Sequence, residues 1–255
     1  MTSVHALGAS LLARTVGLVD GSHSDDQGLF ARDITAWVAS PQQGLTSTIE
    51  SVWGAEAVAG ALTALAPSDL TMVACVPSAH ICWAELERRP NGGDAETCIV
   101  GVSYGDGGEV SRIVWLRAAL VPAFQGDPAR SAPDARPVIE HYFADLMRSR
   151  FREAAGHFAG GVVYSHPPYR SGTARVLYLG RDALARGFAD ERGPTPARQV
   201  ITGFWQQHER LFVEGVVEGI PNGGSFISAG QITPEGEIAR YVAFYSAQRF
   251  AGPPS

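Results

Sequence analysis

The chain repeats itself at half its length, and this repeat constrains the fold more than any local pattern does. The segment Phe30–Ile34 recurs 128 residues later as Phe158–Val162, and Gly108–Val114 recurs at the same offset as Gly236–Val242. Two further blocks keep the same order at similar offsets: Gly54–Val58 with Gly180–Leu184, and Pro90–Gly93 with Pro221–Gly224. The common spacing predicts a tandem duplication of one folding unit.

The repeat divides the chain into two units joined by a segment of turn and breaker residues. Residues 126–137 contain three prolines and a glycine between charged residues, which is typical of an exposed connection. We therefore predict a first unit over residues 1–125, a linker over 126–137 and a second unit over 138–250. With 45% hydrophobic residues in 255, each unit has enough apolar side chains for a core of its own.

The second half shows its element order more clearly than the first. Apolar residues at helical spacing predict one helix near Val138–Met147 and a second from Phe151. A strand is predicted over Gly161–His166 and a short helix over Gly180–Phe188. From Arg198 onward, apolar runs separated by turns at Pro221–Gly224 and Pro234–Gly236 predict a closing antiparallel meander. Helices followed by a sheet indicate an α+β unit.

Composition excludes several classes of function. The 20 basic residues are all arginines, so the chain has no phosphate-loop lysine, no Schiff-base lysine and no pyridoxal anchor, and we expect no cofactor. A net charge of −6 without an arginine-rich face argues against nucleic acid and anionic membranes as partners. The three cysteines, Cys75, Cys82 and Cys98, lack zinc-ribbon spacing and are too few for a disulfide framework, which favours no metal and a reducing cytoplasm.

Both halves resemble the nuclear transport factor 2-like (NTF2-like) superfamily, in particular its SnoaL-like polyketide cyclase and ketosteroid isomerase branch. The resemblance is carried by the paired helices, the strand Val162–His166 followed by Pro167, the helix start at Gly180–Ala183, and the hairpin from Gly236 into Tyr241–Tyr245. It implies cone-shaped units with helices packed in a bent, mostly antiparallel sheet. It also implies that the two units pair through their sheets as an intrachain pseudo-dimer, with further self-association left open.

The resemblance carries catalytic positions onto this sequence only in part. In ketosteroid isomerases the proton-abstracting Asp precedes a Pro at the end of the first strand, and His166 before Pro167 holds that position here. The tyrosine and aspartic acid of the isomerase oxyanion hole align with Phe143 and Ser228, and Tyr142 lies one residue from the tyrosine position. The isomerase constellation is therefore not reproduced, and steroid isomerisation is not expected.

The residues themselves make His166 the best candidate base. An imidazole exchanges a proton near neutral pH, and strand alternation places Tyr164 on the same face to orient it or to donate to a substrate oxygen. The competing interpretation is a strand-end histidine bonded to a nearby carbonyl. Ser228 completes the predicted catalytic set, and the predicted substrate-binding residues are Tyr142, Phe143, Tyr169, Trp205, Phe226, Phe244 and Tyr245, although aromatic residues at strand spacing are most often core.

The first unit lacks the base in this alignment. Ser40 precedes Pro41 where the second unit has His166 and Pro167, and Thr15 stands at the position of Phe143. We therefore predict a degenerate first unit whose role is structural, so that replacing Ser40 changes activity little.

These observations favour a cofactor-independent isomerase or cyclase that uses general acid-base catalysis on a small apolar carbonyl or polyketide-like compound of secondary metabolism. Two alternatives stay open: a dehydratase or epoxide-opening cyclase, and a non-catalytic small-molecule-binding or scaffold protein. An open cavity at His166 and Tyr164 would favour an enzyme, and a cone filled by side chains would favour a scaffold.

Overall fold

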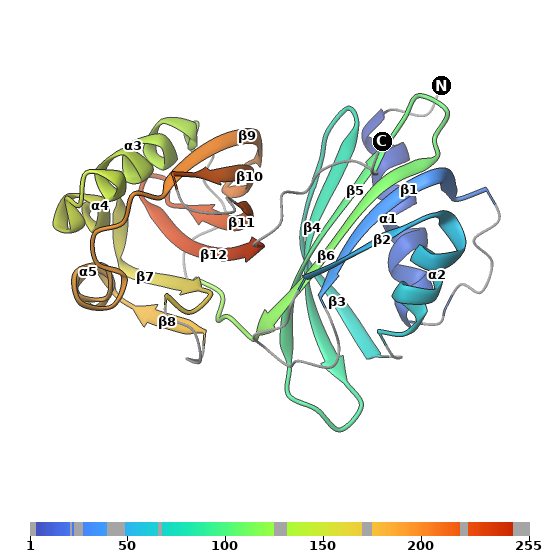
Figure 1. The fold of residues 1–255 in the computed structure, drawn as a ribbon, viewed down its shortest axis with the longest axis horizontal. Helices are drawn as coiled ribbons and strands as arrows, with labels where there is room; N and C mark the ends of the chain where they lie inside the picture. Colours follow the sequence, from blue (N-terminus) through green and yellow to red (C-terminus); the bar gives the residue numbers. More distant parts are fainter. Residues whose placement is uncertain are drawn as a thin grey trace. The chain divides into compact units, whose positions relative to one another are not determined.

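The chain forms two compact units in a computed structural model that describes residues 4–20, 22, 28–39, 49–65, 68–124, 132–169, 175–219 and 224–246. The division falls between Leu120 and Val121. Each unit has its own six-stranded mixed sheet with a few helices (Figure 1). The predicted α+β arrangement of two tandem units is confirmed.

In the described part of the first unit, two helices cover one sheet. The elements are α1 (Val4–Asp20), β1 (Phe30–Ala39), β2 (Ile49–Trp53), α2 (Ala55–Thr63), β3 (Ser68–Pro77), β4 (Ile81–Pro90), β5 (Glu96–Tyr104) and β6 (Val110–Ala119). The strand order is β2-β1-β6-β5-β4-β3, with β1 and β6 parallel and the other pairs antiparallel. Helix α1 packs against β3, β4 and β5, and α2 packs against β1 and β2.

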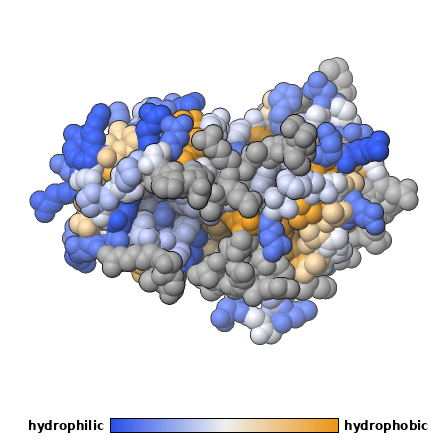
Figure 2. Space-filling view, in the orientation of Figure 1, coloured by the Kyte–Doolittle hydropathy of each residue, from blue (hydrophilic) through white to orange (hydrophobic). Residues whose placement is uncertain are grey.

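The second unit repeats this plan with two added helical segments, a short helix after the counterpart of α1 and a π-helical turn after the counterpart of α2. Its elements are α3 (Arg136–Met147), α4 (Phe151–Gly156), β7 (Phe158–His166), β8 (Val176–Leu179), α5 (Arg181–Arg186), the π-helical turn η2 (Gly187–Arg192), β9 (Arg198–Gln207), β10 (Arg210–Glu218), β11 (Gly224–Ile232) and β12 (Ile238–Ser246). Helix α3 packs against β9, and α4 packs against β7. Figure 2 shows hydrophilic residues over the outer surface of α3 and α4, whose apolar residues face the core.

The repeat extends to the register of the strands. The second sheet has the order β8-β7-β12-β11-β10-β9, which is the order of the first sheet element by element. In each sheet the parallel pair begins with one isolated partner pair, Phe30 with Val110 and Phe158 with Ile238, and then shifts register. Phe158 and Ile238 each lie 128 residues after their counterparts Phe30 and Val110, as the sequence repeat predicts.

The helix that follows the short edge strand begins in the same way in both units. Gly54 precedes α2 with a φ of 88° and Gly180 precedes α5 with a φ of 91°, a conformation that glycine adopts without steric conflict. Each glycine donates its backbone N–H to β1 or β7, to Ile34 O at 2.9 Å and Val162 O at 2.8 Å. The sequence match between these glycines therefore reflects one shared backbone turn.

The predicted elements of the second half differ from the observed ones at three places. The first strand begins at Phe158, three residues before the predicted start, and β8 was not predicted. The apolar run after Arg198 is two strands, because the chain reverses at His208, which has a φ of 53°. No Gly, Pro or Asn marks that turn, so the sequence carried no signal for it.

The segment predicted as a linker is in part packed against the second unit. Residues 126–131 lie outside the described residues, but Ala135 is buried in the second core and Arg136 already begins α3. Upstream, Arg240 on β12 donates to Pro122 O at 2.8 Å and to Val121 O at 3.1 Å. The predicted unit boundaries at 125 and 138 stay predictions.

Candidate active site in the second unit

Aromatic side chains fill the interior of the second unit between α3, the π-helical turn and the sheet. Neighbouring rings stand 4.5 to 6.5 Å apart, mostly edge-to-face or stacked. We call this set the aromatic cluster: Tyr142, Phe143, Phe158, Tyr164, His166, Tyr169, Tyr178, Phe188, Phe226, Tyr241 and Tyr245. Five of the predicted substrate-binding residues are partly or fully buried here in the core: Tyr142, Phe143, Tyr169, Phe226 and Tyr245.

Three hydroxyl groups form a chain through the aromatic cluster. The Tyr164 hydroxyl lies 3.2 Å from that of Tyr142 and 3.4 Å from that of Tyr169, and we call these groups the phenol chain. Burial raises the pKa of all three tyrosines, so they are protonated at neutral pH. A protonated phenol in a dry interior is a strong hydrogen-bond donor to developing negative charge on a substrate oxygen.

His166 stands at the more exposed end of the aromatic cluster with its tautomer fixed. Its ring lies 4.5 Å from the ring of Tyr169 and 4.8 Å from that of Tyr245. The Nδ1 atom is 2.6 Å from Pro167 O, and because a carbonyl oxygen can only accept, Nδ1 carries the hydrogen. The lone pair is therefore on Nε2, the nitrogen that would act as a base.

Burial lowers the pKa of His166 to about 3, and the positive charges of Arg175 and Arg192 act in the same direction. The hydrogen bond to Pro167 opposes this shift only in part. The imidazole is therefore neutral at physiological pH. It can accept a proton, and it cannot begin a reaction as the acid.

Ser228 shares the inner face of the sheet with Tyr164. It pairs with Ala243, which belongs to the interior core, and residues paired directly across strands share a face. Its hydroxyl is fully buried and has no hydrogen-bond partner within normal geometry. Burial raises the pKa of Tyr241, and the nearby Ser228 hydroxyl counteracts part of that rise. Ser228 thus lies beside Tyr241 on the inner face.

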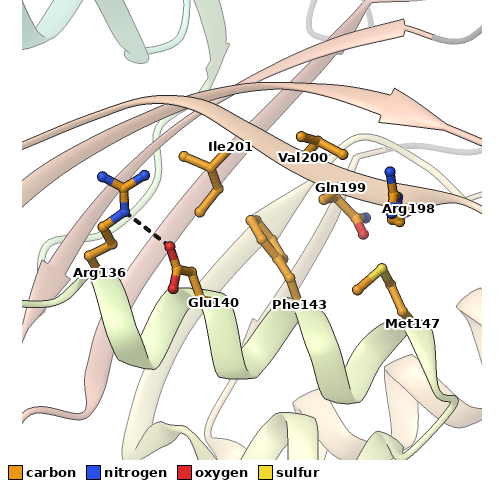
Figure 3. Close-up of a pocket in the computed structure, with 8 residues that line it drawn as sticks. All are labelled: Arg136, Glu140, Phe143, Met147, Arg198, Gln199, Val200 and Ile201. Carbon is orange, nitrogen blue, oxygen red and sulfur yellow. Dashed lines mark hydrogen bonds and ion pairs between the residues drawn. The ribbon is translucent and has the colours of Figure 1, made fainter.

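An open groove lies between α3 and β9, beside the aromatic cluster (Figure 3). We call it the α3–β9 groove; its volume is about 310 Å³, and it is lined by Arg136, Glu140, Phe143, Met147, Arg198, Gln199, Val200 and Ile201. Phe143 meets Phe226 edge-to-face at 5.5 Å, and Gln199 donates from Nε2 to the Tyr245 hydroxyl at 3.3 Å. Phe143 and Gln199 therefore form the wall between the groove and the aromatic cluster.

Two predicted binding residues lie on the other face of the sheet. Trp205 pairs directly with Phe212, and both lie outside the interior core, as does Phe244. The guanidinium of Arg175 instead lies over the Phe244 ring, with Cζ 4.6 Å from the ring centroid. The assignment of Trp205 and Phe244 to the pocket wall is corrected by alternation, because Phe244 and Tyr245 are successive residues of one strand and face opposite sides.

Two residues near His166 and Tyr245 were missed by sequence reasoning. Arg192 ends the π-helical turn, and its charge lowers the pKa of His166 and Tyr169. Single π-helical turns are rare and are frequent at functional sites. Gln199 could have been found from the sequence, because it is a polar residue next to the apolar Val200 and Ile201. Arg192 could not, because it follows Asp190 and Glu191 in a charged run that is typical of exposed surface.

Strand pairing identifies the counterparts of these residues in the first unit. Val38 on β1 stands where His166 stands on β7, and Ala36 stands where Tyr164 stands. The match of Ser40 with His166 is therefore displaced by two residues, and Ser40 itself lies outside the described residues. Val38 is buried and apolar, so the first unit has no base at this position.

In the part of the chain that the structure describes, no helix is long and apolar enough to cross a membrane. No group of three or more His, Cys, Asp or Glu side chains there is arranged to hold a metal ion.

The chain matches solved structures but no protein-family model and no curated protein. A ketosteroid isomerase-like protein from Kribbella flavida is 18% identical, and the match covers 48% of this chain and 83% of that one with a TM-score of 0.37. TerC, crystallised with polyporic acid, is 17% identical over 44% of this chain and 91% of its own, with a TM-score of 0.37.

A third match is SalBIII, an epoxide hydrolase/cyclase-like enzyme with a role in pyran ring formation in the polyether salinomycin. It is 15% identical over 44% of this chain and 90% of its own, with a TM-score of 0.35. At these identities the likeness concerns the fold and carries nothing about the reaction. The structural neighbours are NTF2-like proteins of the ketosteroid isomerase-like and SnoaL-like cyclase kinds, each matching about half of the chain, as the resemblance in the sequence predicts.

Proposed function

We propose that the second unit is a cofactor-independent isomerase or cyclase that acts on a small apolar carbonyl compound, with His166 as the general base. The observation that carries this proposal is the hydrogen bond of 2.6 Å between His166 Nδ1 and Pro167 O. It leaves Nε2 as a neutral acceptor beside the phenol chain, so one site holds a proton acceptor and proton donors.

In the proposed reaction His166 Nε2 takes a proton from the carbon next to the substrate carbonyl. The electron pair of the broken C–H bond moves onto the carbonyl oxygen, and a hydroxyl of the phenol chain donates a hydrogen bond to the enolate. For isomerisation the imidazolium returns its proton to a different carbon of the conjugated enolate. For cyclisation the enolate carbon attacks a second carbonyl of the same molecule, and the imidazolium protonates the resulting alkoxide.

The low pKa of His166 fits this mechanism only if the anion stays close. Burial holds the pKa of the imidazole at about 3, so the protonated form is unfavourable unless a negative charge forms beside it. The enolate supplies that charge. Ser228 is the second proposed donor.

The substrate proposed for this site is small and largely apolar. The α3–β9 groove, which lies beside the aromatic cluster and is not lined by His166, has about 310 Å³, the lower end of the range for ligand pockets, and half of its lining is apolar: Phe143, Met147, Val200 and Ile201. An aromatic or polyketide-like ketone fits this lining. We place such a compound among intermediates of secondary metabolism and the protein in the cytoplasm.

A non-catalytic binding or scaffold protein is the second candidate, and the packing of the cone favours it. Tyr142, Tyr164, Phe158, Phe188 and Phe226 are almost fully buried, so side chains occupy space that a substrate would need. If the rings do not move apart for a ligand, binding stays in the α3–β9 groove and His166 is structural.

Deuterium exchange separates the two candidates. Acetophenone in D₂O is incubated with the wild-type chain, His166→Ala and His141→Ala, and loss of the methyl proton signal is followed by NMR. His141 is an exposed residue of α3 and serves as the matched control. We expect exchange with the wild type and His141→Ala, and a rate ~10² to 10⁴ lower with His166→Ala. Binding of acetophenone with the same exchange rate in all three proteins would support the binding protein instead.

A further inference from the structure

Two cysteines face each other across neighbouring strands of the first unit. Cys75 on β3 and Cys82 on β4 are free thiols, and their Sγ atoms lie 3.4 Å apart. The strands are antiparallel here, with Cys75 opposite Ala84 and Cys82 opposite Pro77, so the two thiols meet on a diagonal of one face. A disulfide has its sulfur atoms ~2.05 Å apart, so the thiols need to approach by little more than one ångström.

The two thiols differ in access and in reactivity. Cys75 is partly exposed and lies on the edge strand of the sheet, whereas Cys82 is fully buried. A hydrogen bond from the Cys82 thiol stabilises the Cys75 thiolate and lowers the pKa of Cys75 to about 7. The third cysteine, Cys98, is fully buried, and burial raises its pKa to about 12.

We propose that Cys75 and Cys82 form an oxidisable dithiol that a peroxide converts into a reversible disulfide between β3 and β4. The Cys75 thiolate attacks the peroxide, the O–O bond breaks, and Cys75 becomes a sulfenic acid while hydroxide (or alkoxide) leaves. The Cys82 sulfur then attacks the sulfenic sulfur, the S–O bond breaks, and the thiol proton leaves with the hydroxyl as water. The peroxide takes up the two electrons that the thiols lose.

The position of the pair defines what the disulfide would do. It would tie the edge strand β3 to β4 next to the turn at Ser78, whose carbonyl accepts a hydrogen bond of 2.8 Å from the Tyr104 hydroxyl. Met72 and Val73 on the same strand are exposed apolar residues. An edge strand that is held in the sheet is less free to pair with another chain. All these residues belong to the first unit, so the inference does not depend on the function proposed for the second.

In the test, the folded full-length chain is treated with hydrogen peroxide. It is then denatured in the presence of N-ethylmaleimide, which alkylates the thiols that remain free. Intact mass and peptide mapping count the thiols that remain. The wild type should lose two of its three thiols and yield a Cys75–Cys82 cross-linked peptide, which dithiothreitol reverses. Cys98→Ser should still lose both of its thiols, whereas Cys75→Ser should form no intramolecular disulfide.

Trapping of the intermediate identifies the attacking sulfur. With dimedone present, Cys82→Ala should accumulate a sulfenic acid adduct on Cys75, at a rate at least ~10-fold above any adduct on Cys98. The cross-linked wild-type peptide is the readout if Cys82→Ala does not fold. Retention of three thiols in the oxidised wild type, or a first adduct on Cys98, would overturn the proposal.

Discussion

The two units share one backbone plan and differ in what fills it. Both sheets have the same strand order and the same register shift in their parallel pair. The core of the first unit is mostly aliphatic, with leucine and valine predominating, whereas the core of the second is rich in phenol and phenyl rings. The strand pattern therefore sets the fold, while a few inward-facing positions set the chemistry.

Three inward-facing positions are apolar in the first unit and polar in the second. Strand pairing matches Val38 with His166 and Ala36 with Tyr164. On the partner strand, Ile113 in the first unit matches Tyr241 in the second. Each replacement adds a polar atom to the second interior without changing the backbone. Changing these positions one at a time should therefore convert the second unit toward the first.

The largest effect is expected when the base is replaced by its counterpart from the first unit. His166→Val should lower acetophenone exchange by ~10² to 10⁴, because a positioned general base contributes about that much. Val38→Ala is the matched control, since it alters the equivalent strand of the first unit and leaves the second intact. Exchange is followed by NMR in D₂O. An equal loss of exchange in Val38→Ala would mean that the first unit takes part and the comparison fails.

The next effect is expected at the centre of the phenol chain. Tyr164→Phe removes the hydroxyl that lies near both Tyr142 and Tyr169, and we expect a loss of ~10² in exchange rate. The free energy of unfolding should fall by only ~1 kcal/mol, since one hydrogen-bonding group is lost from a buried network. Urea unfolding and the exchange assay together measure both quantities. A large loss of stability with unchanged exchange would make the phenol chain structural.

The acid sensitivity of the second unit should depend on His166. Its pKa is about 3 in the folded chain and near the ordinary value of 6.5 in the unfolded chain. Between these values the unfolded state binds a proton and the folded state does not, so the free energy of unfolding falls as the pH falls, by at most ~1.4 kcal/mol per pH unit. This stability is fully present above pH ~6.5.

His166→Gln provides the comparison for this acid effect, because glutamine does not titrate. Thermal unfolding of both proteins is measured between pH 7 and pH 4. The melting temperature of the wild type should fall more steeply than that of His166→Gln. Parallel curves would show that the imidazole titrates alike in the folded and unfolded chains.

The smallest effect is expected at Ser228. Ser228→Ala removes one neutral hydroxyl, so exchange should fall by less than ~10-fold, below the effects at His166 and Tyr164. Stability should change little, because the buried hydroxyl makes no hydrogen bond of normal geometry. The same exchange and urea measurements check both points. A loss greater than that of Tyr164→Phe would reverse the proposed roles of the two donors.

The sequence predicted the repeat, the two helices before the second sheet and the position of the closing meander, because each depends on local periodicity and turn residues. It did not predict β8, a strand of only four residues, or the reversal at His208, where no glycine or proline marks the turn. Nor did it place Trp205 and Phe244, since hydrophobicity does not tell which face of a sheet an apolar strand residue occupies when both faces are buried.

The match of Ser40 with His166 shows a second limit. The only shared feature of the two sites in the sequence is a proline after the residue of interest, and so short a motif can be aligned two residues out of place. The pairing of β1 with β2 and β6 shows that Val38 is the counterpart of His166. The tautomer of His166 likewise depends on Pro167 O, a backbone atom whose direction no sequence pattern reports.

Nitrogen NMR of the imidazole tests whether His166 is a neutral base whose Nε2 is free. With ¹⁵N-labelled protein, and His166→Gln to assign the signals, we expect a protonated Nδ1 and an unprotonated Nε2 that do not titrate between pH 8 and pH 5. A transition near pH 6.5, or a hydrogen on Nε2 at neutral pH, would contradict it.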